Sequence, residues 1–241
     1  MSQKGIFITG TDTGIGKTVV TSCLLAALKN RGLDAGVMKP IETGVDPECN
    51  SIANSDAKFL HQVLGNETSL DDVCQYRFKT AASPLQAALE DDVEPVDEKI
   101  ILKAYSQLAE KHDLVLVEGI GGLLVPIREN YLVVNLIVDL QIPIIVVSPF
   151  KLGAINHTLL TLEIAGKYGV QVKGLIYNPL DNPETTCKSQ EKIIEQFSGI
   201  KSLGECPFIE QLSPESFTLD LIKIIESQLD IKGILNDTKN N

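Results

Sequence analysis

Short, uninterrupted hydrophobic runs recur along the chain and are separated by longer stretches in which apolar and polar residues alternate with helical spacing. A continuous apolar run bounded by polar or glycine-rich residues is typical of a strand that is covered on both faces of a parallel sheet. We expect such strands at residues 6–8, 35–38, 114–117, 142–147 and 172–177, with a last short strand and loop within 203–209.

The stretches between these runs predict helices, because their apolar residues return every three to four positions. We expect helices at residues 19–28, 54–64, 97–111, 133–140, 157–168, 184–197 and 214–229. Residues 66–83 look loop-rich, and the acidic residues of 90–98 look like a solvated surface segment. Alternating strands and helices predict one α/β domain over residues 1–230, with a doubly wound, mainly parallel sheet and helices on both faces, followed by a polar tail at 231–241.

The composition agrees with a globular domain that has an acidic surface. The 241 residues are 44% hydrophobic, which allows a sizeable core, and the formal net charge is −11. Nucleic acids and anionic membranes prefer a basic face, so neither is expected as the main partner. The longest apolar stretches are too short to cross a bilayer, and the chain enters its first strand without an apparent leader.

The cysteines and histidines suggest neither a disulfide framework nor a zinc site. The five cysteines, Cys23, Cys49, Cys74, Cys187 and Cys206, are odd in number, irregularly spaced and without a CxxC pair. The three histidines show no ligand spacing either. Reduced cysteines in a cytoplasmic protein are therefore the expectation.

The clearest chemical signal is the glycine-rich segment Gly10-Thr-Asp-Thr-Gly-Ile-Gly-Lys-Thr18, which follows the first strand and opens the first helix. In this context glycines let backbone N–H groups converge on phosphate oxygens, and the helix N-terminus adds its free N–H groups. Lys17 would reach the terminal phosphates, and the Thr18 hydroxyl would bind magnesium. Thr11 stands where the simplest phosphate-loop pattern has glycine, so an ordinary turn with a solvated lysine is the alternative.

Three further residues end or begin elements beside this loop. Lys39 ends the second strand, where an open α/β sheet binds its ligands, although it could be a surface lysine before Pro40. Glu118 closes the strand at 114–117, in the place of a magnesium-binding acid, and glycines follow it. Asp56 begins a helix and is either its cap or a magnesium ligand. The turn at 151–154 is either an anion site or an ordinary connection.

Several motifs occur in one order between Gly5 and about Glu215: TDTGIGKT, KPIETG, NSDA, VLVEGIGG and KLGAINHTLLT. In the sequence and order of these motifs, the chain resembles the dethiobiotin synthetase family of the P-loop NTPase superfamily. The resemblance implies an ATP- and magnesium-dependent ligase of biotin biosynthesis that converts 7,8-diaminononanoate and carbon dioxide, or bicarbonate, to dethiobiotin. One substrate amine becomes a carbamate, the carbamate takes the γ-phosphoryl group as a carbamic–phosphoric anhydride, and the second amine closes the ureido ring and releases phosphate.

The resemblance also implies roles for individual residues. Nucleotide phosphates are expected at Thr13, Gly14, Ile15, Gly16, Lys17 and Thr18, and magnesium at Thr18, Asp56 and Glu118. Catalytic roles are expected for Thr13, Lys17, Lys39 and Thr43, and substrate contacts for Lys39, Thr43 and Gly121. Glu118, Gly119, Ile120 and Gly121 would border nucleotide and substrate. The adenine is expected at Asn178, Pro179, Pro207, Phe208 and Ile209, with Glu215 as a further nucleotide contact. In a homodimer, Gly153, Ala154 and Asn156 of one subunit would bind the substrate carboxylate of the other subunit's site.

Two positions depart from the family pattern, and other classes share the loop. Position 43 is Thr where some members have Ser, which keeps a hydroxyl, and Pro179 stands in a place that often differs. Partitioning and septum-positioning ATPases are dimeric switches with an extra lysine early in the loop, where this chain has Asp12. Amidotransferases of the cobyric acid type append a glutaminase domain. A pure binding module would leave Lys39 and Glu118 without a role.

Overall fold

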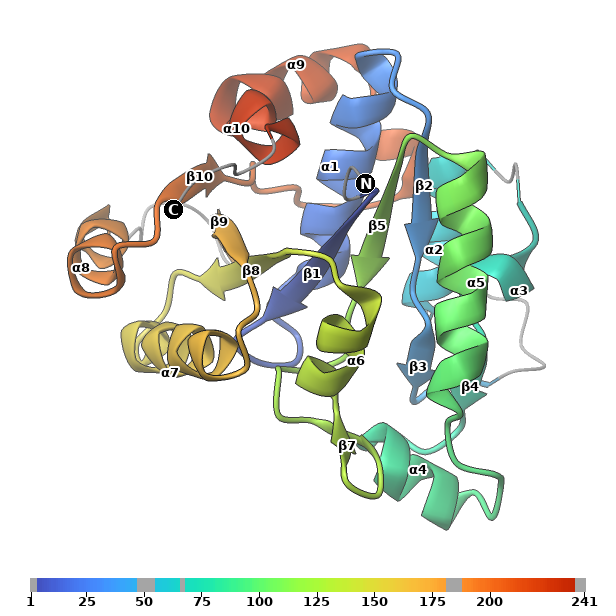
Figure 1. Cartoon of the computed structure of the whole chain (residues 1–241). Helices are drawn as coiled ribbons and strands as arrows, with labels where there is room; N and C mark the ends of the chain where they lie inside the picture. The colour runs from blue at the N-terminus through green and yellow to red at the C-terminus, as the bar shows by residue number, and fades with distance from the viewer. Residues whose placement is uncertain (1–3, 47–54, 66–67, 181–187, 237–241) are drawn as a thin grey trace.

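The hydrophobic runs form one six-stranded parallel sheet with the strand order β10-β9-β8-β1-β5-β2. The computed structural model describes residues 4–46, 55–65, 68–180 and 188–236 (Figure 1). The strands are β1 (Gly5–Gly10), β2 (Ala35–Met38), β5 (Leu114–Glu118), β8 (Ile144–Pro149), β9 (Val172–Asn178) and β10 (Ser202–Glu205). The expected doubly wound α/β class is confirmed.

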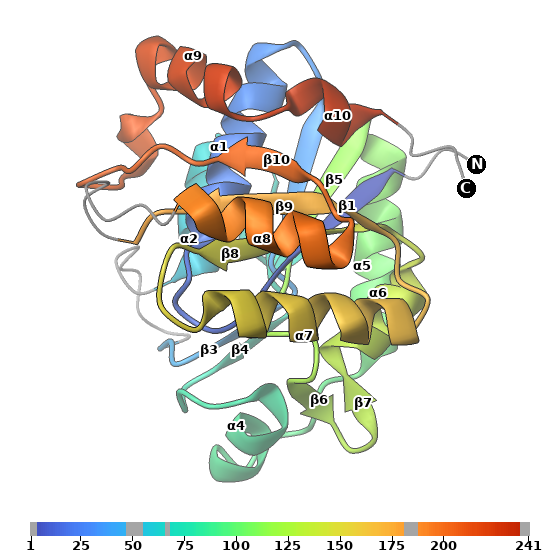
Figure 2. The same cartoon turned by 90° about the vertical axis from the view of Figure 1, so that its left-hand side faces the viewer.

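Helices cover both faces of this sheet (Figures 1 and 2). Side chains alternate between the faces along a strand, so Ile6 and Ile8 of β1 pack on one side and Phe7 on the other. The first face is covered by α1 (Lys17–Asn30), α2 (Asp56–Leu64), α9 (Leu219–Gln228) and α10 (Ile231–Leu235). The second face is covered by α5 (Glu98–Lys111), α6 (Val133–Leu140), α7 (Ala154–Lys167) and α8 (Lys188–Ser198).

Strand β1 lies where the winding of the sheet reverses. From β1 the chain crosses to the edge strand β2, returns to β5 beside β1, and then continues to β8, β9 and β10 on the other side. The ends of three strands are brought level here, since Ile8 is paired with Glu118 and Gly10 with Val147. The loops that follow β1, β2, β5 and β8 therefore meet at one edge, where open α/β sheets bind ligands.

Small elements were missed by the hydrophobic pattern. The loop-rich stretch contains α3 (Leu70–Val73) and β4 (Tyr76–Phe78), and β4 pairs in parallel with β3 (Ile41–Thr43). Helix α4 (Pro84–Glu90) follows, and β6 (Pro126–Arg128) and β7 (Tyr131–Leu132) form a hairpin. These elements span too few residues for a period to show. The helix expected at 214–229 is divided into the 3₁₀ turn η2 (Pro214–Ser216) and α9, because Thr218 caps α9.

The acidic segment at 90–98 is largely exposed, as expected, and two of its carboxylates also contact neighbouring loops. The Asp91 carboxylate accepts hydrogen bonds from the backbone N–H groups of Lys79 and Thr80, at 2.7 and 3.2 Å. Glu98 is paired with Arg128 at 2.8 Å, which links α5 to β6. These carboxylates hold neighbouring loops in place, as capping and ion pairing allow.

The expected polar tail begins later than residue 231. Residues 231–235 form α10, and its side chains Ile231 and Ile234 are buried against α1. These two apolar residues at helical spacing keep the chain packed, so the boundary at 230 is corrected. Residues 237–241 lie outside the described part of the chain.

The cysteine prediction is tested only in part. Cys23, Cys74 and Cys206 are free and buried, whereas Cys49 and Cys187 lie outside the described residues, as do the expected helix starts at Asn54 and Glu184. Among the helices that the structure describes, none combines the length and the apolar character needed to cross a membrane.

Candidate functional site

The glycine-rich loop presents the uncapped N-terminus of α1. Gly16 is the N-cap residue of α1, in the left-handed conformation with φ 85°, and no side chain caps the helix. A Cβ at Gly16 would lie 2.1 Å from Nδ2 of Asn178, which donates a hydrogen bond to the carbonyl of Ile15 at 3.0 Å. Ile15 is buried and anchors the loop. The first N–H groups of α1 are thus free of side-chain caps, as an anion site requires.

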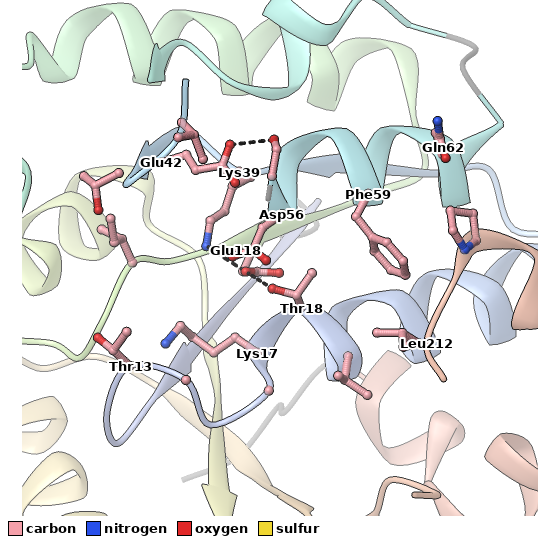
Figure 3. Close-up of a pocket in the computed structure, with 18 of the residues that line it drawn as sticks. Thr13, Lys17, Thr18, Lys39, Glu42, Asp56, Phe59, Gln62, Glu118 and Leu212 are labelled. Atoms are coloured by element: carbon pink, nitrogen blue, oxygen red, sulfur yellow. Dashed lines mark hydrogen bonds and ion pairs between the residues drawn. The ribbon is translucent and has the colours of Figure 1, made fainter. Parts of the chain in front are cut away.

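A cavity of about 880 Å³ opens against this loop (Figure 3). It joins elements that are far apart in sequence: the loop, α1, the ends of β2 and β5, the start of α2, and the loop before η2. The predicted site residues that line it are Thr13, Gly14, Gly16, Lys17, Thr18, Lys39, Thr43, Asp56, Glu118, Ile120, Gly121 and Glu215. One cavity therefore gathers most of the expected phosphate, magnesium and substrate residues.

Lys17 is held inside the loop rather than in solvent. Its side chain is buried, and Nζ donates a hydrogen bond to the carbonyl oxygen of Asp12 at 2.8 Å. Burial lowers the pKa of Lys17 to about 8, and the positive charge of Lys39 acts in the same direction. The solvated-lysine interpretation is therefore wrong. The ammonium group of Lys17 could leave the Asp12 carbonyl and bind an anion in the cavity instead.

Lys39 is the most enclosed cation of the cavity. Its Nζ lies 2.7 Å from Glu118 Oε1, 2.9 Å from the carbonyl oxygen of Gly119 and 3.6 Å from Asp56 Oδ2. Burial alone lowers the pKa of Lys39, but the carboxylates of Glu118 and Asp56 together outweigh burial and raise it above the usual value. Lys39 is thus a permanent buried cation, and the alternative of a surface lysine is wrong.

Oxygen donors suited to magnesium converge on the same point. The Thr18 hydroxyl donates to Glu118 Oε1 at 2.8 Å, while Glu118 Oε2 is buried and has no hydrogen-bond partner. Asp56 faces Lys39 (Figure 3), and Ser55, not Asp56, caps α2 by accepting from the N–H of Lys58. This leaves the Asp56 carboxylate free of the cap role.

The donor set fits a magnesium–nucleotide complex better than a metal held by protein alone. Within the described ranges, no group of three or more His, Cys, Asp or Glu side chains could hold a metal ion. Magnesium usually takes one or two carboxylates together with substrate phosphates and waters. One hydroxyl, two carboxylates and an adjacent phosphate loop match that preference.

The residues expected around the adenine do not line the cavity. Asn178 is buried beneath the loop, where it supports Ile15, and Pro179 is buried next to it. Residues 207–209 lie just before the loop that carries Glu215, and Phe208 is exposed. Gly119 packs against Phe7, because a Cβ there would lie 2.6 Å from the Phe7 ring. Only Glu215 of the expected nucleotide-end residues reaches the cavity.

The turn expected to bind a carboxylate lies at the same edge of the sheet but outside this cavity. Gly153 is the N-cap residue of α7, with φ 88° and no side-chain cap. The side chain of Ala154 is fully buried, and its N–H bonds to the carbonyl of Lys151 at 3.1 Å. Asn156 is exposed. Within one chain the structure does not join this turn to the phosphate loop.

Other lining residues were missed by the sequence interpretation. They are Val19, Glu42, Val45, Ser55, Phe59, Gln62, Leu212, Ser213 and Pro214. Phe59 and Gln62 follow Asp56 at steps of three on α2, so helical spacing could have placed them on the same face. Glu42 flanks Thr43 in the KPIETG segment. Residues 212–214 carry no signal, because only the tertiary path of the loop brings them to the cavity.

Solved structures that share this fold include cell division proteins and a ParA family ATPase. The chain superposes on the MinC:MinD cell division complex of Aquifex aeolicus with a TM-score of 0.56 and 15% identity, covering 99% of this chain and 98% of that one. A ParA family ATPase of Chlorobium tepidum gives 0.53 and 10% identity, with 97% and 93% covered. At such identities the likeness concerns the fold alone.

Sequence relatives are more specific. A family model described as an AAA domain matches residues 4–216. The ATP-dependent dethiobiotin synthetase BioD of Nitrosopumilus maritimus is 33% identical, covering 97% of this chain and 100% of its own length. BioD of Thermodesulfovibrio yellowstonii is 36% identical, with 97% and 99% covered, and BioD of Bacillus subtilis strain 168 is 33% identical, with 97% and 98% covered. The chain belongs to the ATP-dependent dethiobiotin synthetase family.

Proposed function

We propose that this protein is an ATP- and magnesium-dependent dethiobiotin synthetase. It would condense 7,8-diaminononanoate with carbon dioxide and close the ureido ring, with formation of ADP and phosphate. The observation that carries this proposal is the single cavity in which a phosphate loop, a buried lysine from β2 and a buried carboxylate from β5 meet. Full-length similarity to BioD proteins supports the choice of reaction.

The nucleotide phosphates would occupy the N-terminus of α1. Free backbone N–H groups and the helix dipole favour the negative charge there, and Lys17 would leave the Asp12 carbonyl to contact a phosphate. Thr18, Asp56 and Glu118 are the residues that would hold magnesium, which supplies positive charge to the transferring phosphoryl group. The adenosine would extend along the loop that ends at Glu215, past the apolar side chains of Phe59 and Leu212.

Lys39 would bring two anions together. A carbamate and a γ-phosphate repel each other, and a buried cation between them lowers that repulsion more than an exposed one, because water screens it less. Lys39 is held in place by Glu118 and the carbonyl of Gly119, so it needs little reorganisation when the reaction occurs. Thr43 and Gly121 line the same end of the cavity and would position the diamine.

We propose that the active unit is a homodimer in which residues 153–156 of one subunit bind the substrate carboxylate in the other subunit's site. The uncapped start of α7 suits a carboxylate through its remaining backbone N–H groups, because the Ala154 side chain is buried and its N–H bonds to Lys151. The acidic net charge argues against nucleic acid or an anionic membrane as the main partner, and we propose a cytoplasmic enzyme with small-molecule substrates.

The partitioning-type switch is the weaker candidate. Its loop lysine is replaced by Asp12, whose carboxylate turns back to accept the N–H of Thr13 at 2.8 Å. MinD and ParA structures share 10 to 16% identity with this chain, against 32 to 36% for BioD proteins. No feature of the cavity favours a switch over a synthetase.

The dependence of ATP hydrolysis on the other substrates tests the proposal. ADP release is measured with the diamine alone, bicarbonate alone, both, and neither. A synthetase releases ADP rapidly only with both, because the carbamate is the phosphoryl acceptor. Equal hydrolysis in all four mixtures would favour an ATPase switch instead. The Lys17→Ala variant serves as the background control, with an expected loss of about a hundredfold or more in rate.

A further inference from the structure

A buried carboxylate that the sequence interpretation did not single out stands beside the magnesium residues. Glu42 belongs to β3, is only 4% exposed and lines the cavity. Its Oε2 accepts a hydrogen bond from the Ser55 hydroxyl at 2.8 Å, and its Oε1 accepts the backbone N–H of Ala57 at 3.3 Å. The two oxygens thus hold the residues directly before and after Asp56.

The position of Asp56 depends on these two hydrogen bonds of Glu42. Its side chain is 52% exposed, and the structure gives it one ionic contact, with Lys39 at 3.6 Å. A short side chain with so few contacts is placed by its backbone. That backbone begins α2, where Ser55 both donates to Glu42 and accepts the N–H of Lys58 at 3.1 Å. Glu42 therefore fixes the helix start that aims Asp56 at the cavity.

We infer that Glu42 is a positioning residue that acts through Asp56 to set how strongly the site binds magnesium together with nucleotide. This inference rests on the proposed role of Asp56 and deepens it. Glu42 would not touch the metal, because both of its oxygens are engaged by α2. Groups that orient metal ligands typically change metal affinity about 10- to 100-fold when removed.

A purely structural role predicts a different outcome from a positioning role. If Glu42 only stabilised the fold, its removal would weaken nucleotide binding with and without magnesium alike. If it positions Asp56, the phosphate loop is untouched, since Glu42 forms no hydrogen bond with it in the described structure. Only the gain in affinity that magnesium provides would then fall.

The test is a titration of the purified protein with ADP, by calorimetry, in excess magnesium and again in EDTA. For Glu42→Ala we expect the magnesium-dependent gain in affinity to fall by about tenfold and the affinity in EDTA to stay unchanged. Glu42→Gln keeps an acceptor oxygen, so its loss should be smaller. Glu94→Ala removes an exposed carboxylate elsewhere and serves as the control for net charge.

A double-mutant cycle decides whether Glu42 acts through Asp56. In an Asp56→Ala background, Glu42→Ala should produce no further loss, because the residue that it positions is gone. Additive losses, or equal losses in EDTA, would overturn the inference. Should Glu42→Ala fail to unfold cooperatively, Glu42→Gln gives the same comparison with the helix start less disturbed, because it keeps the Ser55 cap and an acceptor oxygen. The readout is binding, so it stands apart from any failure to form dethiobiotin.

Discussion

Two lysines in one cavity have opposite pKa shifts because their neighbours differ. Lys17 is buried near another cation, and the hydrogen bond of its ammonium group goes to the carbonyl of Asp12, so burial lowers its pKa to about 8. Lys39 is also buried, but Glu118 and Asp56 raise its pKa above the usual value. Lys39 therefore stays protonated, whereas full protonation of Lys17 would depend on an incoming anion.

The lowered pKa of Lys17 predicts that nucleotide affinity falls with rising pH. Above a pH of about 8 the free protein loses the Lys17 proton, and phosphate binding must then take a proton up. The affinity for ADP in EDTA should therefore decrease by up to about tenfold per pH unit above that value. Lys17→Arg, which stays charged, should bind ADP without this trend. Affinity that is flat from neutral pH to well above 8 in the native protein would contradict the assignment.

Removing Lys39 should separate stability from nucleotide binding. Lys39→Ala leaves Glu118 buried without its ion pair, which typically costs about 3 to 5 kcal/mol. Urea denaturation should show that loss, and turnover should nearly vanish while ADP binding in EDTA is largely kept. The matched variant Lys39→Met with Glu118→Gln removes both charges and should regain stability but not turnover. A Lys39→Ala protein as stable as the native one would refute the buried pair.

At the scale of elements, the hydrophobic pattern predicts the helices and strands that are long or fully buried. All six central strands were expected, and β2 has the predicted bounds. The pairing of β3 with β4 was not expected, because each has three residues and owes its place to contacts across the chain. α10 was missed because two isoleucines, Ile231 and Ile234, are too few to reveal a period.

The residues of the candidate site likewise fall into those that the sequence predicts and those that only the tertiary structure reveals. Lys17, Thr18 and Glu118 are found from sequence because strand, turn and helix order fixes where they lie. Glu42 gave no signal, because its role depends on a hydrogen bond to Ser55 that only the tertiary structure creates. The resemblance predicted the carboxylate turn at residues 153–156. It did not predict that the side chain of Ala154 is buried, because burial depends on the tertiary packing.

The loop conformation gives a prediction about two glycines. Gly16→Ala should destabilise the loop and abolish ADP binding, because φ is 85° and the new Cβ would meet Asn178. Gly166→Ala is the control: it lies in α7 with nothing within 4 Å of a new Cβ. That change should raise stability by up to about 1 kcal/mol and spare binding. Calorimetry and thermal unfolding of both variants check this, and unchanged ADP binding by Gly16→Ala would count against the loop.

On the scale of the whole molecule, the proposed dimer would complete the cavity for a substrate with a carboxylate tail. The cations of the cavity, Lys17 and Lys39, are committed to phosphates and the carbamate in the proposed mechanism. The turn at residues 153–156 lies at the same edge of the sheet and outside the cavity. A second copy of the chain would supply it, on the logic of a closed two-fold dimer.

Mixing two inactive variants tests this arrangement. Lys39→Ala disables the cavity, and Asn156→Glu places a competing carboxylate on the exposed side of the turn without disturbing buried Ala154. After random subunit exchange half of the dimers are mixed, and each mixed dimer has one intact site. Activity should recover to about a quarter of the native value. Absence of recovery, with exchange verified by native mass spectrometry, would place each site within one chain.

In the proposed reaction this cavity converts a diamine, carbon dioxide and ATP to a cyclic urea. The most direct measurement incubates the protein with 7,8-diaminononanoate, MgATP and isotope-labelled bicarbonate and identifies the product by mass. We expect dethiobiotin that carries the label in its ureido carbon, formed in equal amount with ADP and absent with Lys39→Ala. ADP formation without labelled dethiobiotin would contradict it.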